Sequence, residues 1–179
     1  MLLKKFCVLC SGIILVLSSF CINAKEQNVT IKMIKIEAVK TVEDRGDELY
    51  FSITQHTNKE EPKLFRVPMF PLHWLSKELP EIKNISIWKA KLADNQSILV
   101  MLSLMEQDLE PWNSDDHIGS VQVQIINDKG KISTKWGRPH LSDQPEVKQP
   151  NQKQPKFVLM GHGAEYKVEF TVESHDSGR

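Results

Sequence analysis

Short runs in which apolar and polar residues alternate constrain the fold of this chain more than any other feature. In residues 49–54 and 98–104 every second position carries a large apolar side chain. A period of two suits a strand with one buried face, whereas an amphipathic helix requires a period near 3.6. Comparable runs occupy residues 29–38, 64–67, 85–88, 121–125, 132–136, 157–160 and 166–172. The sequence therefore predicts an all-β fold, an antiparallel β-sandwich of eight or nine short strands.

Local signals predict how these runs are connected. Residues 127–130 and the Gly161-His162-Gly163 segment predict tight hairpin turns. The inward parity changes between Met33 and Ile34, which predicts a β-bulge or a twist in this strand. The proline-punctuated segment 68–80 breaks the alternation and has room for one short helix over residues 76–79.

The first 24 residues differ from the rest of the chain. Lys4 and Lys5 precede an apolar run that ends at Phe20, and Ala24 supplies a small residue at a cleavage point. This arrangement is typical of a cleaved secretory signal peptide. A lipid anchor on Cys21 is the alternative, although Phe20 is bulkier than the residue that usually precedes a lipidated cysteine.

Cleavage after residue 24 removes all three cysteines and two of the 23 basic residues, so that 21 basic and 23 acidic residues remain. A secreted domain without disulfides is typical of bacterial export, so we expect the periplasm or the extracellular space. Residues 25–179 are expected to form one domain, with a flexible polar insertion at about residues 142–156. The charge balance and the lack of a basic stripe argue against a nucleic-acid partner.

Negative charge is concentrated in two segments, each of which follows a predicted strand. The first segment holds Glu43, Asp44, Asp47 and Glu48, and the second holds Glu106, Asp108, Glu110, Asp115 and Asp116. If both segments project from one end of the sandwich, their carboxylates repel one another unless a cation lies between them. Calcium is the favoured cation because it accepts six to eight oxygen ligands in flexible geometry.

These two segments resemble the calcium loops of C2 domains, a family of calcium-binding β-sandwiches. The residues from Asp44 to Phe51 are similar to the family's first calcium loop, and those at 106–108 and 116–119 to its third. The resemblance covers roughly residues 31–125 and implies a C2-like sandwich. The implied calcium ligands are Asp44, one of Asp47 and Glu48, Glu106, Asp108 and Asp116.

Two apolar residues, Leu109 and Trp112, lie between the implied ligands of the second segment. In membrane-docking C2 domains such residues enter the lipid interface, so the resemblance implies that Leu109 and Trp112 contact membrane. The alternative is that Trp112 folds back as a cap over the end of the sandwich.

The expected function is that of an exported, calcium-dependent binding module that docks on an anionic phospholipid membrane or an acidic partner. The alternative is a metal-independent secreted domain that binds another protein, in which case the acidic segments are simply solvated. A hydrolase using a carboxylate pair is a third possibility. Enzymatic activity is not expected, because the sequence offers no recognisable set of His, Tyr or Arg residues to accompany Glu106 and Asp108.

Overall fold

Eleven strands and one short helix make up the part of the chain that the computed structural model describes, namely residues 25–58, 60–108, 114–139, 149–150 and 153–177. The strands are β1 (Gln27–Lys40), β2 (Glu48–Thr57), β3 (Glu60–Val67), β4 (Trp74–Leu75), β5 (Lys83–Leu92), β6 (Ser97–Glu106), β7 (Asp116–Asp128), β8 (Lys131–Gly137), β9 (Gln149–Pro150), β10 (Lys156–Gly161) and β11 (Ala164–Asp176). The helix is a 3-10 turn, η1 (Ser76–Glu81).

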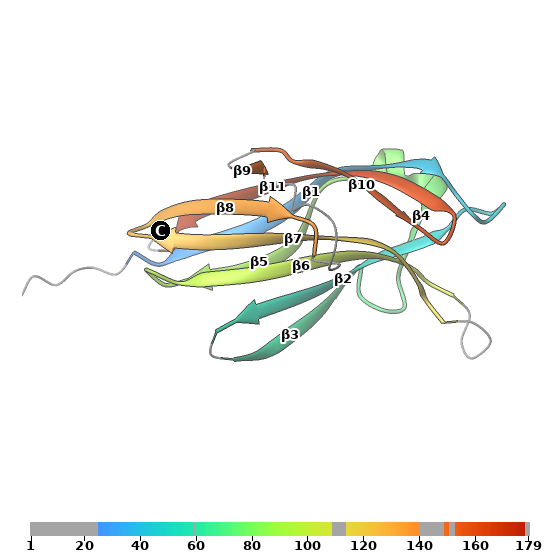
Figure 1. Ribbon diagram of the computed structural model, residues 1–179. Helices are drawn as coiled ribbons and strands as arrows, with labels where there is room; N and C mark the ends of the chain where they lie inside the picture. Colours follow the sequence, from blue (N-terminus) through green and yellow to red (C-terminus); the bar gives the residue numbers. More distant parts are fainter. Residues whose placement is uncertain (1–24, 59, 109–113, 140–148, 151–152, 178–179) are drawn as a thin grey trace, which may run out of the picture.

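The strands form two antiparallel sheets that face each other as a sandwich (Figure 1). The order in the smaller sheet is β10-β11-β1-β5. The order in the larger sheet is β3-β2-β6-β7-β8-β9, with β4 paired to β2. The expected all-β class and two-sheet architecture are confirmed. Eight or nine strands were predicted, and each of the nine alternating runs forms a strand; the two additional strands, β4 and β9, have two residues each.

The predicted local irregularities are also present. The pairing of β1 with β11 shifts register between Met33 and Lys35, as the change of parity in β1 indicated. Two-residue turns join β7 to β8 and β10 to β11. In the second of these turns His162 has φ 50° and Gly163 has φ 89°, the left-handed values that such tight hairpins require.

The core lies between the inward faces of the two sheets. Phe170 of β11 stacks on Trp136 of β8, with ring centroids 5.6 Å apart, and meets Phe51 of β2 edge-on at 5.9 Å. All three side chains are buried. Since Phe170 belongs to one sheet and the other two rings to the opposite sheet, this aromatic cluster holds the layers together.

The predicted signal peptide, residues 1–24, lies outside the described residues, as does most of the predicted polar insertion at residues 142–156. Within that insertion, Gln149 and Pro150 pair with Trp136 and Lys135 of β8 and so extend the larger sheet. In the described part of the chain, no helix has the length and apolar character that crossing a membrane requires.

Candidate metal site

Two acidic segments that lie far apart in the sequence meet at one end of the sandwich. The β1–β2 connection, residues 41–47, and the end of β6 lie at this end (Figure 1). Leu49 at the start of β2 pairs with Glu106 at the end of β6, and the Gln107 amide donates to the Glu48 carbonyl at 2.7 Å. The sheet register therefore places residues 43–48 next to residues 106–108.

Asp47 holds the first segment in place. Its Oδ1 accepts hydrogen bonds from the amides of Val42 and Glu43, both at 3.0 Å, and its Oδ2 accepts one from the Tyr166 hydroxyl. Its own amide donates to Ser76 Oγ at 2.9 Å. The side chain is fully buried, and burial together with the adjacent Asp47 carboxylate raises the pKa of Tyr166 well above its ordinary value. Asp47 thus shapes the turn that carries Glu43.

Glu106 carries a carboxylate toward the interior. In β6 the inward-facing positions are Ile98, Val100, Leu102 and Leu104, and the same period of two makes Glu106 the next inward position at the rim. The residue is 8% exposed, and its Oε1 has no hydrogen-bond partner among the described residues. Burial raises the pKa of Glu106 to about 7, and the nearby carboxylates of Asp108 and Glu43 contribute to the rise.

Three carboxylates converge on one point. Oxygens of Glu43, Glu106 and Asp108 all lie within 4.8 Å of one another. Glu43 comes from the β1–β2 connection, Glu106 is the last residue of β6, and Asp108 follows it by two residues. Asp108 Oδ2 is buried and, like Glu106 Oε1, has no hydrogen-bond partner in the described part of the chain. We call Glu43, Glu106 and Asp108 the carboxylate cluster.

The cluster includes two of the six candidate ligands named from the sequence, Glu106 and Asp108. Of the other four, Asp44 is exposed at the tip of the turn and Asp47 is engaged as described above. Glu48 turns toward His73, with Oε2 3.5 Å from Nδ1. Asp116 pairs with His162 of the β10–β11 turn at 3.0 Å.

The implied membrane-contacting residues, Leu109 and Trp112, lie outside the described residues. Their contacts stay predictions. The same holds for the cap that Trp112 was alternatively expected to form.

Sequence reasoning had not assigned Glu43 and Asp115 a role in the site. Glu43 belongs to the acidic segment recognised in the sequence, but the family resemblance placed the ligand one residue later, at Asp44. For Glu106, the period of two in β6 is the signal that could have shown its inward position, although the predicted alternation was not extended that far.

Asp115 stabilises the second acidic segment through two hydrogen bonds. It accepts hydrogen bonds from the Tyr50 hydroxyl at 2.6 Å and from the Asp108 amide at 3.1 Å. Burial, followed by this bond to Asp115, raises the pKa of Tyr50 to about 12. The Arg66 guanidinium stacks on the Tyr50 ring, 3.5 Å from its centroid, and donates to Gln107 Oε1. These contacts fix the backbone from which Asp108 projects.

The cluster fits the requirements of calcium. Calcium binds oxygen at about 2.3–2.6 Å, so two ligands on opposite sides of one ion lie about 4.6–5.2 Å apart. The 4.8 Å limit within the cluster is compatible with this span. Three carboxylates can supply up to six oxygens when they bind in bidentate fashion, and backbone carbonyls or water can complete the shell. The unpaired buried oxygens of Glu106 and Asp108 are the atoms that such an ion would satisfy.

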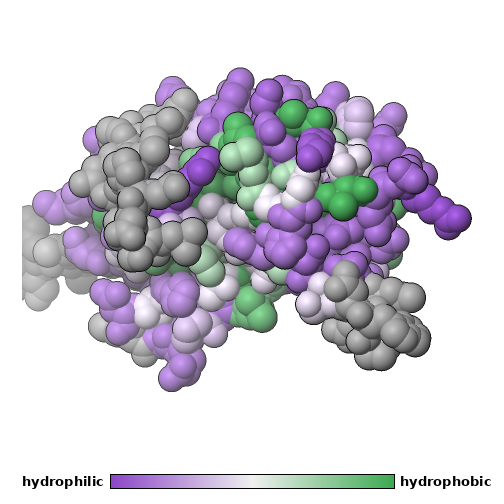
Figure 2. Space-filling view, turned by 45° about the vertical axis from the view of Figure 1, so that its right-hand side comes forward, coloured by the Kyte–Doolittle hydropathy of each residue, from purple (hydrophilic) through white to green (hydrophobic). Residues whose placement is uncertain are grey.

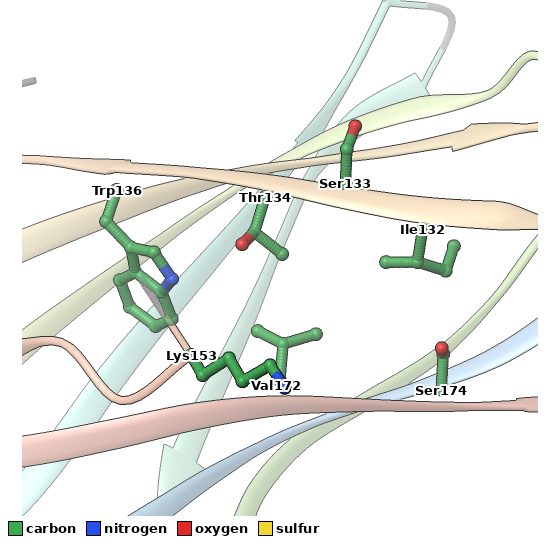
Figure 3. A pocket seen from close by; sticks show the side chains of 7 residues that line it. All are labelled: Ile132, Ser133, Thr134, Trp136, Lys153, Val172 and Ser174. Carbon is green, nitrogen blue, oxygen red and sulfur yellow. The ribbon is translucent and has the colours of Figure 1, made fainter. Parts of the chain in front are cut away.

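A cavity of about 230 Å³ lies elsewhere, between β8 and β11 (Figure 3). Its lining includes Trp136, Val172, two serine hydroxyls and the Lys153 amine. None of its seven lining residues is a carboxylate or a histidine, so the lining lacks the acid and base pair that most hydrolytic sites use.

No protein-family model and no curated protein sequence matches this chain. Among solved structures, a human group IVD cytosolic phospholipase A2 in complex with a fluorophosphonate inhibitor and terbium chloride is 12% identical, with a TM-score of 0.39. That match covers 85% of this chain and 18% of the phospholipase chain. A C2 domain of a plant extended synaptotagmin 1 is 11% identical, with a TM-score of 0.36, over 84% of this chain and 96% of that domain.

One of the matching structures is thus a C2 domain, the family that the two acidic segments resemble. At these scores the likeness is remote. The assignment of a two-sheet sandwich rests on the strand pairing, and the description of the site rests on its own contacts.

Proposed function

We propose that this chain is an exported calcium-binding module that docks on phospholipid membranes when the ion is bound. The calcium ligands in this proposal are Glu43, Glu106 and Asp108. The role is one of binding rather than catalysis, and the compartment is the periplasm or the extracellular space.

One observation carries the proposal. Glu106 places a carboxylate at a buried position beside two other carboxylates, where burial and mutual repulsion both oppose its ionisation. A solvated acidic loop would spread its charges into water instead of burying one of them. A bound cation removes both penalties, because it offsets the charge and satisfies the unpaired oxygens of Glu106 and Asp108.

The expected affinity is modest. With only three carboxylates, the site falls in the range of extracellular calcium modules, with a Kd of about 10⁻⁴ to 10⁻³ M. Magnesium should substitute poorly, since it requires tighter octahedral geometry at about 2.0–2.1 Å from its ligands.

Thermal unfolding of residues 25–179 in about 10 mM calcium or in chelator tests the proposal, because the ion is then in roughly ten- to hundredfold excess over the expected Kd. Such an excess stabilises the folded state by about 1.4 to 2.7 kcal/mol. For a domain of this size the melting temperature should therefore rise by about 3 to 10 °C. Glu106→Gln and Asp108→Asn should each abolish the rise.

Asp44→Asn is the matched control, because Asp44 lies in the same turn as Glu43 but outside the carboxylate cluster. This variant should keep the calcium-induced rise. An equal melting temperature for the parent protein in calcium and in chelator would refute the proposal, and so would a rise of equal size in magnesium.

A further inference from the structure

The exposed apolar side chains of this protein are concentrated on one edge of the larger sheet. The described residues expose nine large apolar side chains, and five of these lie between residues 64 and 72. They are Leu64 and Phe65 on β3, exposed by 72% and 40%, and Met69, Phe70 and Leu72 in the loop that follows. Figure 2 shows hydrophobic residues in small separate groups within a mostly hydrophilic surface. A local concentration of this kind is typical of an interaction surface.

β3 forms a free edge of the larger sheet. The strand order begins with β3, and within the described residues β2 is its only partner. Figure 1 shows the β2–β3 hairpin at the margin of the sandwich. A free edge presents backbone N–H and C=O groups that lack a partner strand, so another extended chain can pair with it.

Leu64 and Phe65 point to opposite faces of this edge. Phe65 lies opposite Ile53, whose side chain is buried in the core, and Leu64 lies opposite Thr54. Residues directly opposite each other in an antiparallel pair share a face, so Phe65 faces the smaller sheet and Leu64 faces away from it. Phe65 is nonetheless 40% exposed, so the smaller sheet covers it incompletely. A strand added beside β3 would cover both side chains.

Only one half of β3 carries the features that usually protect a sheet edge. Charged residues, proline and register shifts all discourage edge pairing. The first half holds four such residues, Glu60, Glu61, Pro62 and Lys63, and its pairing with β2 shifts register. The second half, residues 64–67, has one charged residue, Arg66, whose guanidinium stacks on the Tyr50 ring of the same chain, 3.5 Å from the centroid. The second half is therefore open to pairing.

The charges of β3 favour a second copy of the same strand that runs antiparallel to the first. Glu60 and Glu61 lie at one end of the strand, and Arg66 lies near the other end. Two parallel copies would bring the acidic ends together, whereas two antiparallel copies place each acidic end beside the basic end of the other. Antiparallel pairing of identical strands also obeys the two-fold symmetry of most homodimers.

Two-fold symmetry requires one residue of β3 to lie opposite its own copy. If that residue were Lys63, two ammonium groups would face each other, which is unfavourable. If it were Phe65, the overlap would be limited to residues 63–67. With Leu64 at this position the overlap extends over residues 61–67, and Lys63 lies opposite Phe65 of the second copy. A cation and an aromatic ring attract each other in such a pair.

We propose that β3 pairs with β3 of a second copy of this chain, antiparallel about Leu64, so that the larger sheets of two molecules form one continuous sheet. The pairing covers Leu64 and Phe65. It also brings the loop 68–73, which Arg66 Nη2 ties to β3 by donating to the Leu72 carbonyl at 3.4 Å, beside the β2–β3 turn of the other copy. One strand pair is smaller than a standard interface of about 1,200–2,000 Å², so the dimer is reversible. The carboxylate cluster takes no part, and the dimer forms with or without calcium.

Sedimentation equilibrium of residues 25–179 at about 5 to 500 µM, in calcium and in chelator, measures the association. The average mass should rise with concentration toward twice that of the monomer in both solutions. Leu64→Lys places two like charges opposite each other and should weaken the dimer at least about tenfold. Met160→Lys is the matched control, because Met160 is 62% exposed on β10, an edge strand of the smaller sheet. At low protein concentration both variants should melt at the temperature of the parent, which shows that they are folded.

Disulfide trapping tests the register. Residues 25–179 contain no cysteine, so a single introduced cysteine can form a disulfide only with its copy in a second molecule. Residues directly opposite each other in an antiparallel pair have Cα atoms about 4.5–5.5 Å apart, which a disulfide can span. Leu64→Cys should therefore form a covalent dimer under mild oxidation at least about tenfold faster than Met160→Cys. Phe65→Cys should react more slowly than Leu64→Cys, because Phe65 lies opposite Lys63 of the second copy.

A parent protein that stays monomeric over the whole concentration range would overturn the inference. So would a dimer that Leu64→Lys leaves intact, or equal trapping rates for Leu64→Cys and Met160→Cys. Faster trapping of Phe65→Cys than of Leu64→Cys would overturn the pairing about Leu64. None of these results bears on the calcium site, which the melting temperature in calcium and in chelator tests separately.

Discussion

Replacement of Glu106 by glutamine should stabilise the metal-free protein at neutral and alkaline pH and at the same time abolish its response to calcium. In the folded protein burial and neighbouring carboxylates raise the pKa of Glu106 from 4.5 to about 7. The side chain is 8% exposed, so solvent screens this effect little. A pKa shift of that size corresponds to about 3 kcal/mol in the free energy of unfolding.

The direction of the pH dependence follows from the pKa of Glu106, which is higher in the folded chain than in the unfolded chain. Below about pH 4.5 the carboxyl is protonated in both the folded and the unfolded chain, so it imposes no penalty on folding. Above about pH 7 it is ionised in both states, and the folded state then carries the full penalty. Because of Glu106, the free energy of unfolding therefore falls as the pH rises from about 4.5 to 7.

Urea unfolding in chelator at about pH 5, 6, 7 and 8, followed by tryptophan fluorescence, measures this effect across the titration. At about pH 8 Glu106→Gln should be more stable than the parent by up to about 3 kcal/mol, because the amide is neutral at every pH. Over this pH range the variant should lose less stability than the parent. The Asp44→Asn control should keep the pH dependence of the parent. If Glu106→Gln is less stable than the parent at the alkaline end in chelator, the burial of an uncompensated charge is the wrong description of this position.

Three other substitutions test separate parts of the structure. Glu43→Gln should weaken calcium binding at least about tenfold in isothermal titration, whereas Asp44→Asn should change it much less, because only Glu43 belongs to the carboxylate cluster. Asp47→Ala should lower the free energy of unfolding by about 2–4 kcal/mol in urea, because it removes the acceptor of three hydrogen bonds at a buried position. Phe170→Ala should lower it by about 3–5 kcal/mol, because the ring joins the two sheets.

The fold could be predicted largely from local pattern. The period of two in β2 and β6, the change of parity after Met33 and the glycines of the hairpin turns each specify backbone geometry without reference to distant residues. The two-residue strands β4 and β9 were missed because they are too short to show any alternation.

The candidate site could be predicted only in part. The two acidic segments follow from the sequence, and the period of two in β6 could have shown that Glu106 faces inward. Which carboxylate of a segment joins the cluster and which holds the backbone cannot be predicted in this way, because it depends on hydrogen-bond partners far along the chain. Asp47 accepts a hydrogen bond in the interior from Tyr166, 119 residues later, and Asp115 accepts one from Tyr50, 65 residues earlier. No spacing rule within the acidic segments distinguishes these carboxylates from Glu43 or Asp108.

The bond between Tyr166 and Asp47 also ties the first acidic turn to a strand far along the chain. Tyr166 belongs to β11, which pairs with β1 along almost its whole length. A nascent or truncated polypeptide that stops before residue 166 lacks both this hydroxyl and the strand beside β1. The turn that presents Glu43 then lacks one of the hydrogen bonds that hold Asp47 in the interior. The geometry of the proposed ion site therefore depends on β11 as well as on the two acidic segments.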